Sequence, residues 1–199
     1  MRRARKGVVI TSPYLIPGEA GIETFSESIE RHGVKYTLVT NSLAATDEPV
    51  VHTGYRRYRP QMLELGMNLY ELSPQQVRRS LRLGRFSTSI GRLHAKSAVV
   101  DGERVFIGSM NFDPRSDQHN TEMGLFIQSP ALAQQVLKLV DVLRQQGAYK
   151  VVLAPNGKDI VWTTTGPGGR EEVVEEPETD VWTRIMLELL SVIAPEGLL

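Results

Sequence analysis

The sequence predicts an α/β protein built on a mixed, mostly parallel sheet with helices on both faces. Residues 8–72 alternate between short apolar runs and amphipathic stretches, in the order strand, helix, strand, helix, strand. This order is typical of parallel strands joined by helical crossovers. Residues 93–108 hold two apolar runs separated by Asp101 and Gly102, a dipeptide that favours a hairpin and therefore an antiparallel pair. The two patterns together predict a mixed sheet.

The first half of the chain supplies the parallel part. Strands are expected over 8–11, 34–40 and 67–72. A helix is expected over 19–31, because Ile22, Phe25 and Ile29 recur at intervals of three and four. A polar loop over 41–53 precedes a second helix over 54–65, in which Pro60 marks either the start or a kink.

The second half returns to strands and ends in helices. Residues 75–91 are rich in Arg, Ser and Gly and are expected to form a loop. Strands follow over 93–100, 104–108 and 122–128, and then a helix over 130–146 that begins at a proline. We expect a single domain over 1–199, with 149–199 as a C-terminal extension packed on it.

The composition excludes several classes of protein. The hydrophobic fraction of 41% and the charged fraction of 23% are those of an ordinary globular protein. There are no cysteines, so disulfides, zinc-thiolate sites and thiol nucleophiles are excluded. No apolar run is long enough to cross a membrane, and the basic residues 1–6 lead into a strand rather than into a secretory signal.

The zero net charge conceals an asymmetry between the two halves. Residues 1–100 carry 15 Lys/Arg and 8 Asp/Glu, whereas residues 101–199 carry 8 and 15. A stretch without carboxylates leads into His94 and carries five arginines: Arg78, Arg79, Arg82, Arg85 and Arg92. Such a stretch attracts phosphate-bearing partners, either nucleic acid or an anionic lipid surface. For any single arginine, solvation of a loop is the simpler interpretation.

The polar residues of the segment 93–126 suit a phosphodiester. His94 and Lys96 stand two apart on an expected strand and so share a face, as do Ser109 and Asn111 at the end of the returning strand. An ammonium and neutral donors would hold the non-bridging oxygens, while a neutral imidazole attacks phosphorus. Glu122 is placed to fix the imidazole tautomer. No metal-ligand spacing lies nearby, so we expect a metal-free site without a cofactor.

Three further residues have two interpretations each. Asp101 completes the spacing H-x-K-x4-D but is at least as well explained as a hairpin-turn residue. His52, in the polar loop, is either a substrate contact or a surface or capping histidine. Tyr14 lies in a loop at the carboxyl end of the first strand, where α/β proteins tend to place function, and is a possible substrate contact.

These residues resemble a known family. His94, Lys96 and Asp101, followed by Gly108, Ser109 and Asn111, are similar to the HKD motif of the phospholipase D superfamily. Asn120 and Glu122 match its downstream N-x-E. The resemblance extends over residues 12–18, 41–55, 69–71 and 176–177 to the C-terminal half of bacterial cardiolipin synthases, C-type subgroup.

The resemblance implies a phosphatidyltransferase that forms cardiolipin through a phosphohistidine intermediate. His94 would be the nucleophile, although the histidine of a second motif is an alternative. Lys96, Ser109 and Asn111 would bind phosphate, Glu122 would orient the histidine, and Asp101 would be structural. Phosphatidylglycerol and phosphatidylethanolamine would be the substrates. The chain would sit peripherally on the anionic cytoplasmic face of the bacterial inner membrane.

One departure from the family pattern limits this interpretation. The chain holds only one H-x-K, whereas the family brings two HKD motifs together. The second half would come from an N-terminal domain or from a second copy of this chain. The alternatives are therefore a homodimeric phosphodiesterase or nuclease, and a catalytically incomplete fragment. Nucleic acid is the less expected partner, because Phe86 is the only aromatic residue between Tyr70 and Val105.

Overall fold

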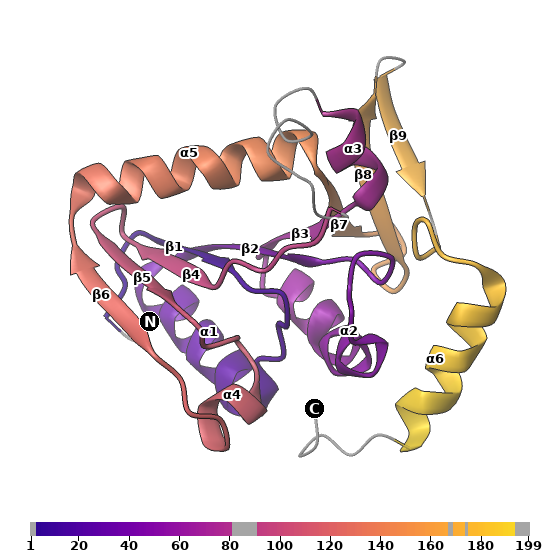
Figure 1. Ribbon diagram of the computed structural model, residues 1–199, viewed down its shortest axis with the longest axis horizontal. Helices are drawn as coiled ribbons and strands as arrows, with labels where there is room; N and C mark the ends of the chain where they lie inside the picture. Colours follow the sequence, from indigo (N-terminus) through magenta and orange to yellow (C-terminus); the bar gives the residue numbers. More distant parts are fainter. Residues whose placement is uncertain (1–2, 81–90, 167–168, 174, 194–199) are drawn as a thin grey trace.

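A computed structural model describes residues 3–80, 91–166, 169–173 and 175–193. Arg82 and Arg85 of the arginine-rich stretch lie outside these residues. Within them, nine strands form a single open sheet in the order β6-β5-β4-β1-β2-β3-β7-β8-β9. The predicted mixed sheet flanked by helices is confirmed (Figure 1).

The strands and helices have the following bounds. The strands are β1 (Gly7–Thr11), β2 (Lys35–Asn41), β3 (Asn68–Leu72), β4 (Ser97–Val100), β5 (Arg104–Gly108), β6 (Gly124–Gln128), β7 (Ala148–Leu153), β8 (Ile160–Gly166) and β9 (Gly169–Val173). The helices are α1 (Gly18–His32), α2 (Pro49–Glu64), α3 (Pro74–Arg79), α4 (Pro114–Gln118), α5 (Pro130–Gln146) and α6 (Val181–Ile193).

The expectation of a mostly parallel sheet is wrong. Among the described strands, only β1–β2 and β2–β3 pair in parallel; the other six pairings are antiparallel. The helices α1 and α2 provide the crossovers that parallel pairing requires. Several later strands follow one another through short connections, and short connections allow only antiparallel neighbours.

Three local boundaries also differ from the expectation. Helix α2 begins at Pro49 rather than at 54, because proline suits the first helical position, so His52 is helical. Helix α3 lies in the expected loop, where the Ser73 hydroxyl caps it by accepting from the Gln76 amide at 3.0 Å. Strand β4 starts only at Ser97, so His94 and Lys96 precede it.

Helices cover both faces of the sheet, and each face has its own core. On one face α1 and α2 bury Phe25 and Met62 against Leu38 and Leu69 of the central strands. On the other face α5 packs through Ala133 and Val140, and Figure 1 shows it lying across the sheet. Because both faces are covered, the neighbouring residues Leu38 and Val39 of β2 are both buried, one in each core.

The C-terminal residues continue the sheet beyond β3. Strand β7 pairs with β3, and β8 and β9 follow by antiparallel pairing. Helix α6 packs beside α2 and exposes an apolar stripe: Val181, Trp182, Ile185, Met186 and Leu189. Within the described part of the chain, no helix combines the length and the apolar character that a membrane span needs.

Candidate active site

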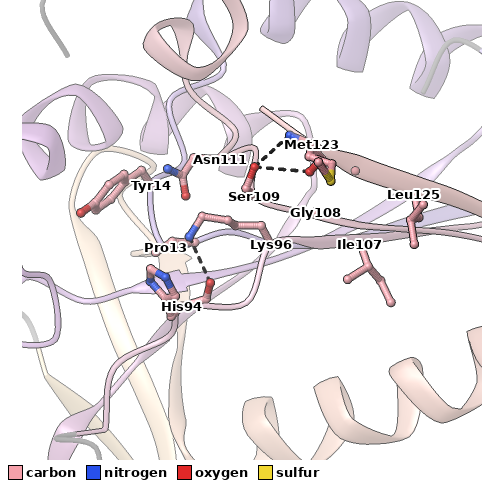
Figure 2. A pocket seen from close by; sticks show the side chains of 11 residues that line it. Pro13, Tyr14, His94, Lys96, Ile107, Gly108, Ser109, Asn111, Met123 and Leu125 are labelled. Carbon is pink, nitrogen blue, oxygen red and sulfur yellow. Dashed lines mark hydrogen bonds between the residues drawn. The ribbon is translucent and has the colours of Figure 1, made fainter. Parts of the chain in front are cut away.

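One cavity collects most of the predicted site residues. Its volume is about 670 Å³, and its wall includes His94, Lys96, Ser109, Asn111 and Tyr14. Figure 2 shows these polar groups around the hollow, with the apolar side chains of Ile107 and Leu125 along one side. The cavity lies at one end of β4 and β5, where the irregular segments beside these strands meet.

An irregular segment, rather than a strand, presents His94 and Lys96. Leu93, the residue before His94, is held by the Asn41 side chain at the end of β2. The Asn41 side chain accepts from the Leu93 amide at 2.8 Å and donates to the Leu93 carbonyl at 3.1 Å. The Lys96 ammonium donates to the His94 carbonyl at 3.1 Å. His94 is exposed at the cavity wall. Both side chains line the same cavity, as expected. The segment that carries them is irregular, so the alternation of side chains along a strand is not the cause.

The loop after β5 presents Ser109 and Asn111. The Ser109 amide donates to the Met123 carbonyl at 2.8 Å, and the Ser109 hydroxyl accepts from the Met123 amide at 3.0 Å. That hydroxyl also bonds to the Glu122 carboxylate. Glu122 accepts a further bond from the Asn120 side chain at 3.3 Å. These bonds fix the carboxylate beside Ser109, and its expected role as the partner of His94 stays a prediction.

The loop after β1 closes the cavity on another side. The Ser12 hydroxyl donates to the Tyr14 carbonyl at 2.5 Å and accepts from the Phe112 amide at 2.9 Å, which joins this loop to the Asn111 loop. The Tyr14 hydroxyl donates to Asp47 at 3.0 Å. Burial, and then the Asp47 hydrogen bond, raise the pKa of Tyr14 to about 12. Tyr14 is therefore a neutral residue of the cavity wall. Its hydroxyl is held by Asp47, which lies in the loop that precedes α2.

Lys96 is the cationic side chain on the cavity wall. Partial burial lowers the pKa of Lys96, and the carboxylates of Glu122, Asp47 and Asp113 oppose that shift. The hydrogen bond from Ser109 holds the pKa of Glu122 below its ordinary value. At neutral pH the cavity thus combines a cation, a hydroxyl, a carboxamide and an imidazole. Such a set can bind the oxygens of a phosphodiester and present a nucleophile to it.

The sequence reasoning missed the residues that position this set. Ser12, Asn41 and Asp47 hold the three segments of the wall in place. Ser12 directly follows β1 and Asn41 ends β2. Polar residues at the carboxyl ends of adjacent parallel strands are a recognisable signal for a site, and they were available in the sequence.

Comparisons with known proteins identify the family of this chain. The family model described as cardiolipin synthase, PLD-like domain, matches residues 1–143. The chain belongs to this family. The predicted membership of the phospholipase D superfamily is confirmed.

Two relatives match nearly the whole of this chain. The chain is 41% identical over 194 residues to cardiolipin synthase C of Escherichia coli strain K12, covering 96% of this chain and 40% of that protein. It is 32% identical over 188 residues to an uncharacterized protein of Helicobacter pylori, covering 94% of this chain and 36% of that one. The chain therefore spans about two fifths of the length of these curated relatives.

Solved structures of low sequence identity share the fold. A phospholipase D family member, Nuc from Salmonella typhimurium, has a TM-score of 0.56 at 17% identity, over 76% of this chain and 85% of that one. A phosphatidylserine synthase of Haemophilus influenzae has a TM-score of 0.55 at 15% identity, over 96% of this chain and 40% of that one. The phospholipase D-like fold is thus shared by both.

Asp101 of this PLD-like domain lies away from the cavity. It follows β4 at the end opposite Lys96 and adopts a φ of 56° in the β4–β5 turn. Its carboxylate accepts from the amides of Arg5, Lys6 and Gly7 at 2.8–3.2 Å. Burial raises the pKa of Asp101, but these amides outweigh it and hold the pKa below its ordinary value. The turn interpretation fits this position.

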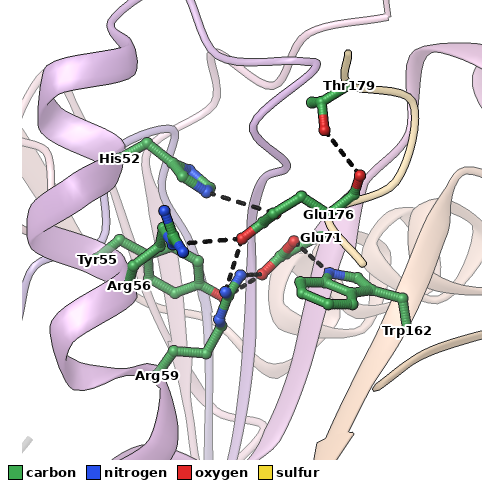
Figure 3. Close-up of polar contacts among 8 residues, drawn as sticks. All are labelled: His52, Tyr55, Arg56, Arg59, Glu71, Trp162, Glu176 and Thr179. Atoms are coloured by element: carbon green, nitrogen blue, oxygen red, sulfur yellow. Dashed lines mark hydrogen bonds and ion pairs between the residues drawn. The ribbon is translucent and has the colours of Figure 1, made fainter. Parts of the chain in front are cut away.

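His52 also lies apart, in a buried polar cluster between α2, β3 and β8. We define the Glu71 cluster as His52, Tyr55, Arg59, Glu71, Trp162 and Glu176 (Figure 3). Arg59 bridges the two carboxylates, with 2.9 Å to Glu71 and 2.7 Å to Glu176. His52 is only 4% exposed, so the surface or capping interpretation is wrong, and it does not line the His94 cavity.

No group of three or more His, Cys, Asp or Glu side chains with the arrangement of a metal site occurs among the described residues. The metal-free mechanism stays a prediction.

Three arginines of the arginine-rich stretch lie among the described residues. Arg78 and Arg79 lie in the last turn of α3, and Arg92 is exposed next to Leu93.

Proposed function

We propose that this chain supplies the phosphate-binding half, with His94 as nucleophile, of a cardiolipin synthase-like phosphatidyltransferase. The observation that carries the proposal is the convergence of His94, Lys96, Ser109 and Asn111 on one cavity. Similarity to cardiolipin synthase C over 96% of the chain supports a phospholipid as the substrate. The apolar side chains of Ile107, Met123 and Leu125 on the cavity wall support the same choice.

The proposed reaction has two steps. A ring nitrogen of His94 attacks phosphorus of the donor phospholipid, phosphatidylglycerol or phosphatidylethanolamine, and the bond from phosphorus to the headgroup oxygen breaks as the nitrogen–phosphorus bond forms. The leaving glycerol or ethanolamine takes a proton from an acid of the second half. The acceptor hydroxyl of a phosphatidylglycerol then gives its proton to the same group and attacks phosphorus, which releases His94. Lys96, Ser109 and Asn111 would hold the non-bridging oxygens through both steps.

A second half is part of the proposal. The chain has a single H-x-K, and His94 is exposed at the cavity wall rather than enclosed. The acid that protonates the leaving alcohol would come from a further domain or from a second copy. Phosphatidylglycerol and phosphatidylethanolamine are the proposed substrates, and we propose a peripheral position on the cytoplasmic face of a bacterial inner membrane.

A second candidate function is a homodimeric phosphodiesterase of the same superfamily. The observation that favours it is that this chain accounts for 85% of the length of Nuc, so a unit of this size makes up nearly a whole chain there. In that case two copies would bring two His94 side chains together across a two-fold axis. The acceptor would be water rather than a lipid hydroxyl.

Product analysis separates these functions. Purified chain, with its oligomeric state measured by light scattering, is incubated with vesicles of phosphatidylglycerol and phosphatidylethanolamine. Cardiolipin formation that His94→Ala abolishes and the surface control His32→Ala retains is the expected result. Phosphatidic acid as sole product favours hydrolysis. If neither product forms, from monomer or from dimer, the isolated chain is not the enzyme. Loss of activity in EDTA contradicts the metal-free mechanism.

A further inference from the structure

The carboxyl end of β2 holds the residue that precedes His94 in the way a neighbouring strand would. The Asn41 side chain accepts from the amide of Leu93 and donates to its carbonyl, at 2.8 and 3.1 Å. In an antiparallel sheet, a residue exchanges the same two bonds with the backbone of the strand beside it. The carboxamide of Asn41 therefore takes the place of a strand partner for an irregular segment.

Both bonds lie in the protein interior. Asn41 is 2% exposed, and Leu93 is 6% exposed and belongs to the core cluster that contains Val39 and Val140. Removing a buried hydrogen-bond partner is costly, because the groups left behind cannot bond to water. Leu93 is thus held in place by its packing and by both of its backbone polar groups.

The His94 segment is held from both of its ends. Asn41 holds Leu93 on one side, and on the other the Gly108 amide donates to the Lys96 carbonyl at 3.1 Å. Only His94 and the residue after it lie between these two points. A shift of Leu93 would therefore pass directly to the imidazole, while Lys96 keeps its own bond to β5.

Asn41 does not itself line the His94 cavity. A substitution of Asn41 therefore removes no substrate contact from the cavity wall. Its effect on the reaction would come from the placement of His94 alone.

We propose that Asn41 is a positioning residue for the reaction at His94. Through Leu93 it sets where the attacking nitrogen stands relative to the phosphate in the cavity. A misplacement of about 1 Å can lower the rate of a reaction about 100-fold. This inference rests on the proposed function and deepens it, because it names the residue that places the proposed nucleophile.

The burst of p-nitrophenolate from the phosphodiester bis(p-nitrophenyl) phosphate tests this role. Asn41→Asp keeps the size of the side chain and the acceptor for the Leu93 amide, but it loses the donor to the Leu93 carbonyl. The burst rate constant should fall about 100-fold. The half-saturating substrate concentration should stay nearly unchanged, because the phosphate-binding side chains remain. Asn41→Ala, which loses both bonds, should be at least as slow.

The rate constant separates positioning from folding. A variant that only destabilises the fold loses burst amplitude in proportion to its unfolded fraction, while its folded fraction reacts with the wild-type rate constant. A wild-type rate constant in both Asn41 variants, at any amplitude, overturns the proposal. Absence of a folded fraction in both also overturns it, since Asn41 would then be a residue of the fold.

The residue before Asn41 supplies a matched control. Thr40 is also 2% exposed, and its hydroxyl donates to the Pro13 carbonyl at 3.2 Å. Thr40→Val removes this bond at the same end of β2, but it acts on the loop after β1, which the Ser12 hydroxyl also holds. The burst rate constant of Thr40→Val should be close to that of wild type. A loss equal to that in Asn41→Asp would mean that any damage at this end of β2 slows the reaction, and the proposal would fail.

Hydrogen exchange at the Leu93 amide reports the same contact without any chemistry. The amide should exchange slowly in wild type and in Thr40→Val, and faster in Asn41→Ala. Equal exchange in wild type and Asn41→Ala would mean that Asn41 does not hold the segment, which overturns the proposal.

Failure of this inference differs from failure of the proposed function. Without a burst in wild type, the proposed function fails and the positioning role fails with it. A burst in wild type that the Asn41 variants share would leave His94 as the nucleophile and remove the positioning role alone.

Discussion

The His94 cavity and the Glu71 cluster each combine a histidine with cationic and carboxylate side chains, yet they differ in nearly every physical respect. The Glu71 carboxylate is 0% exposed and accepts from Tyr55, Arg59 and Trp162 at 2.7–2.9 Å. His94 is exposed, and the Glu122 carboxylate lies on the surface beside Ser109. The side chains of the buried cluster bind one another, whereas those of the open site present hydrogen-bond donors and an imidazole to a cavity.

The difference shows how to recognise a site among polar clusters. Buried charges are tolerated when partners surround them, and they then connect elements that are distant in sequence. Here Arg59 links α2 to β3 and to Glu176, which is 117 residues away in sequence. Groups that must bind a substrate keep open directions, and a cavity supplies them. Substitutions in the two clusters should therefore separate activity from stability.

The largest expected effect comes from exchanging the two histidines for alanine. His94→Ala should lower activity by roughly 10³-fold or more, because it removes the proposed nucleophile, while the unfolding midpoint stays unchanged. His52→Ala should retain activity and destabilise the fold by about 2 kcal/mol or more, because it leaves a buried cavity. Turnover assays and urea denaturation measure both. Loss of activity without loss of stability at His52 would contradict the comparison.

The two carboxylates should differ next. Glu71→Gln removes a buried charge from Arg59 and should cost about 3–5 kcal/mol of unfolding free energy. The matched change Glu122→Gln, on a partly exposed side chain, should leave the urea midpoint nearly unchanged and lower turnover. A stable Glu71→Gln variant would show that the buried cluster does not hold the fold together.

The pH dependence of stability distinguishes the buried histidine. Burial lowers the pKa of His52 to about 3, opposed by Glu176, whereas the unfolded value is about 6.5. Below about pH 6.5 His52 therefore binds a proton in the unfolded chain but stays neutral in the folded chain. Proton binding favours the unfolded state, so the free energy of unfolding decreases as the pH falls below this value. Between pH 6.5 and 4 the loss should reach at most about 3 kcal/mol.

The matched variant His52→Gln should show a shallower decline over the same pH range in urea denaturation. An identical slope in wild type and variant would mean that His52 is protonated in the folded chain.

The smallest effect is expected at the β4–β5 turn. Asp101→Ala removes the acceptor of three backbone amides and should cost about 1–3 kcal/mol, with activity retained because Asp101 does not line the cavity. Asp101→Asn keeps one acceptor oxygen and tolerates the positive φ, so it should cost less. A loss of turnover in a stable Asp101→Asn variant would return this residue to the site.

Much of the fold follows from local patterns, and the failures have definite causes. Periodicity and capping residues predicted α1 and α5 to within two residues of their ends. The sheet was expected to be mostly parallel because the strand–helix alternation of residues 8–72 was extended to the whole chain. The hairpin at Asp101 was itself a sign that later strands pair differently.

The site was predictable in membership but not in its supports. Residue types and spacing placed His94, Lys96, Ser109 and Asn111 together, and the cavity contains all four. The spacing could not reveal that Asn41 clamps Leu93, because that contact spans 52 residues of sequence. Likewise His52 gave no sign of burial, since its cluster forms only when Glu176 reaches α2.

The central claim is that His94 attacks phosphorus, and a covalent adduct tests it most directly. Bis(p-nitrophenyl) phosphate is a suitable probe, because its leaving group departs without protonation and so makes no demand on a second half. We predict one equivalent of p-nitrophenolate per chain in a rapid burst and an acid-labile phosphoryl adduct that mass spectrometry maps to His94. His94→Ala should show neither. Absence of the burst in wild type, or an adduct on another residue, would contradict this mechanism.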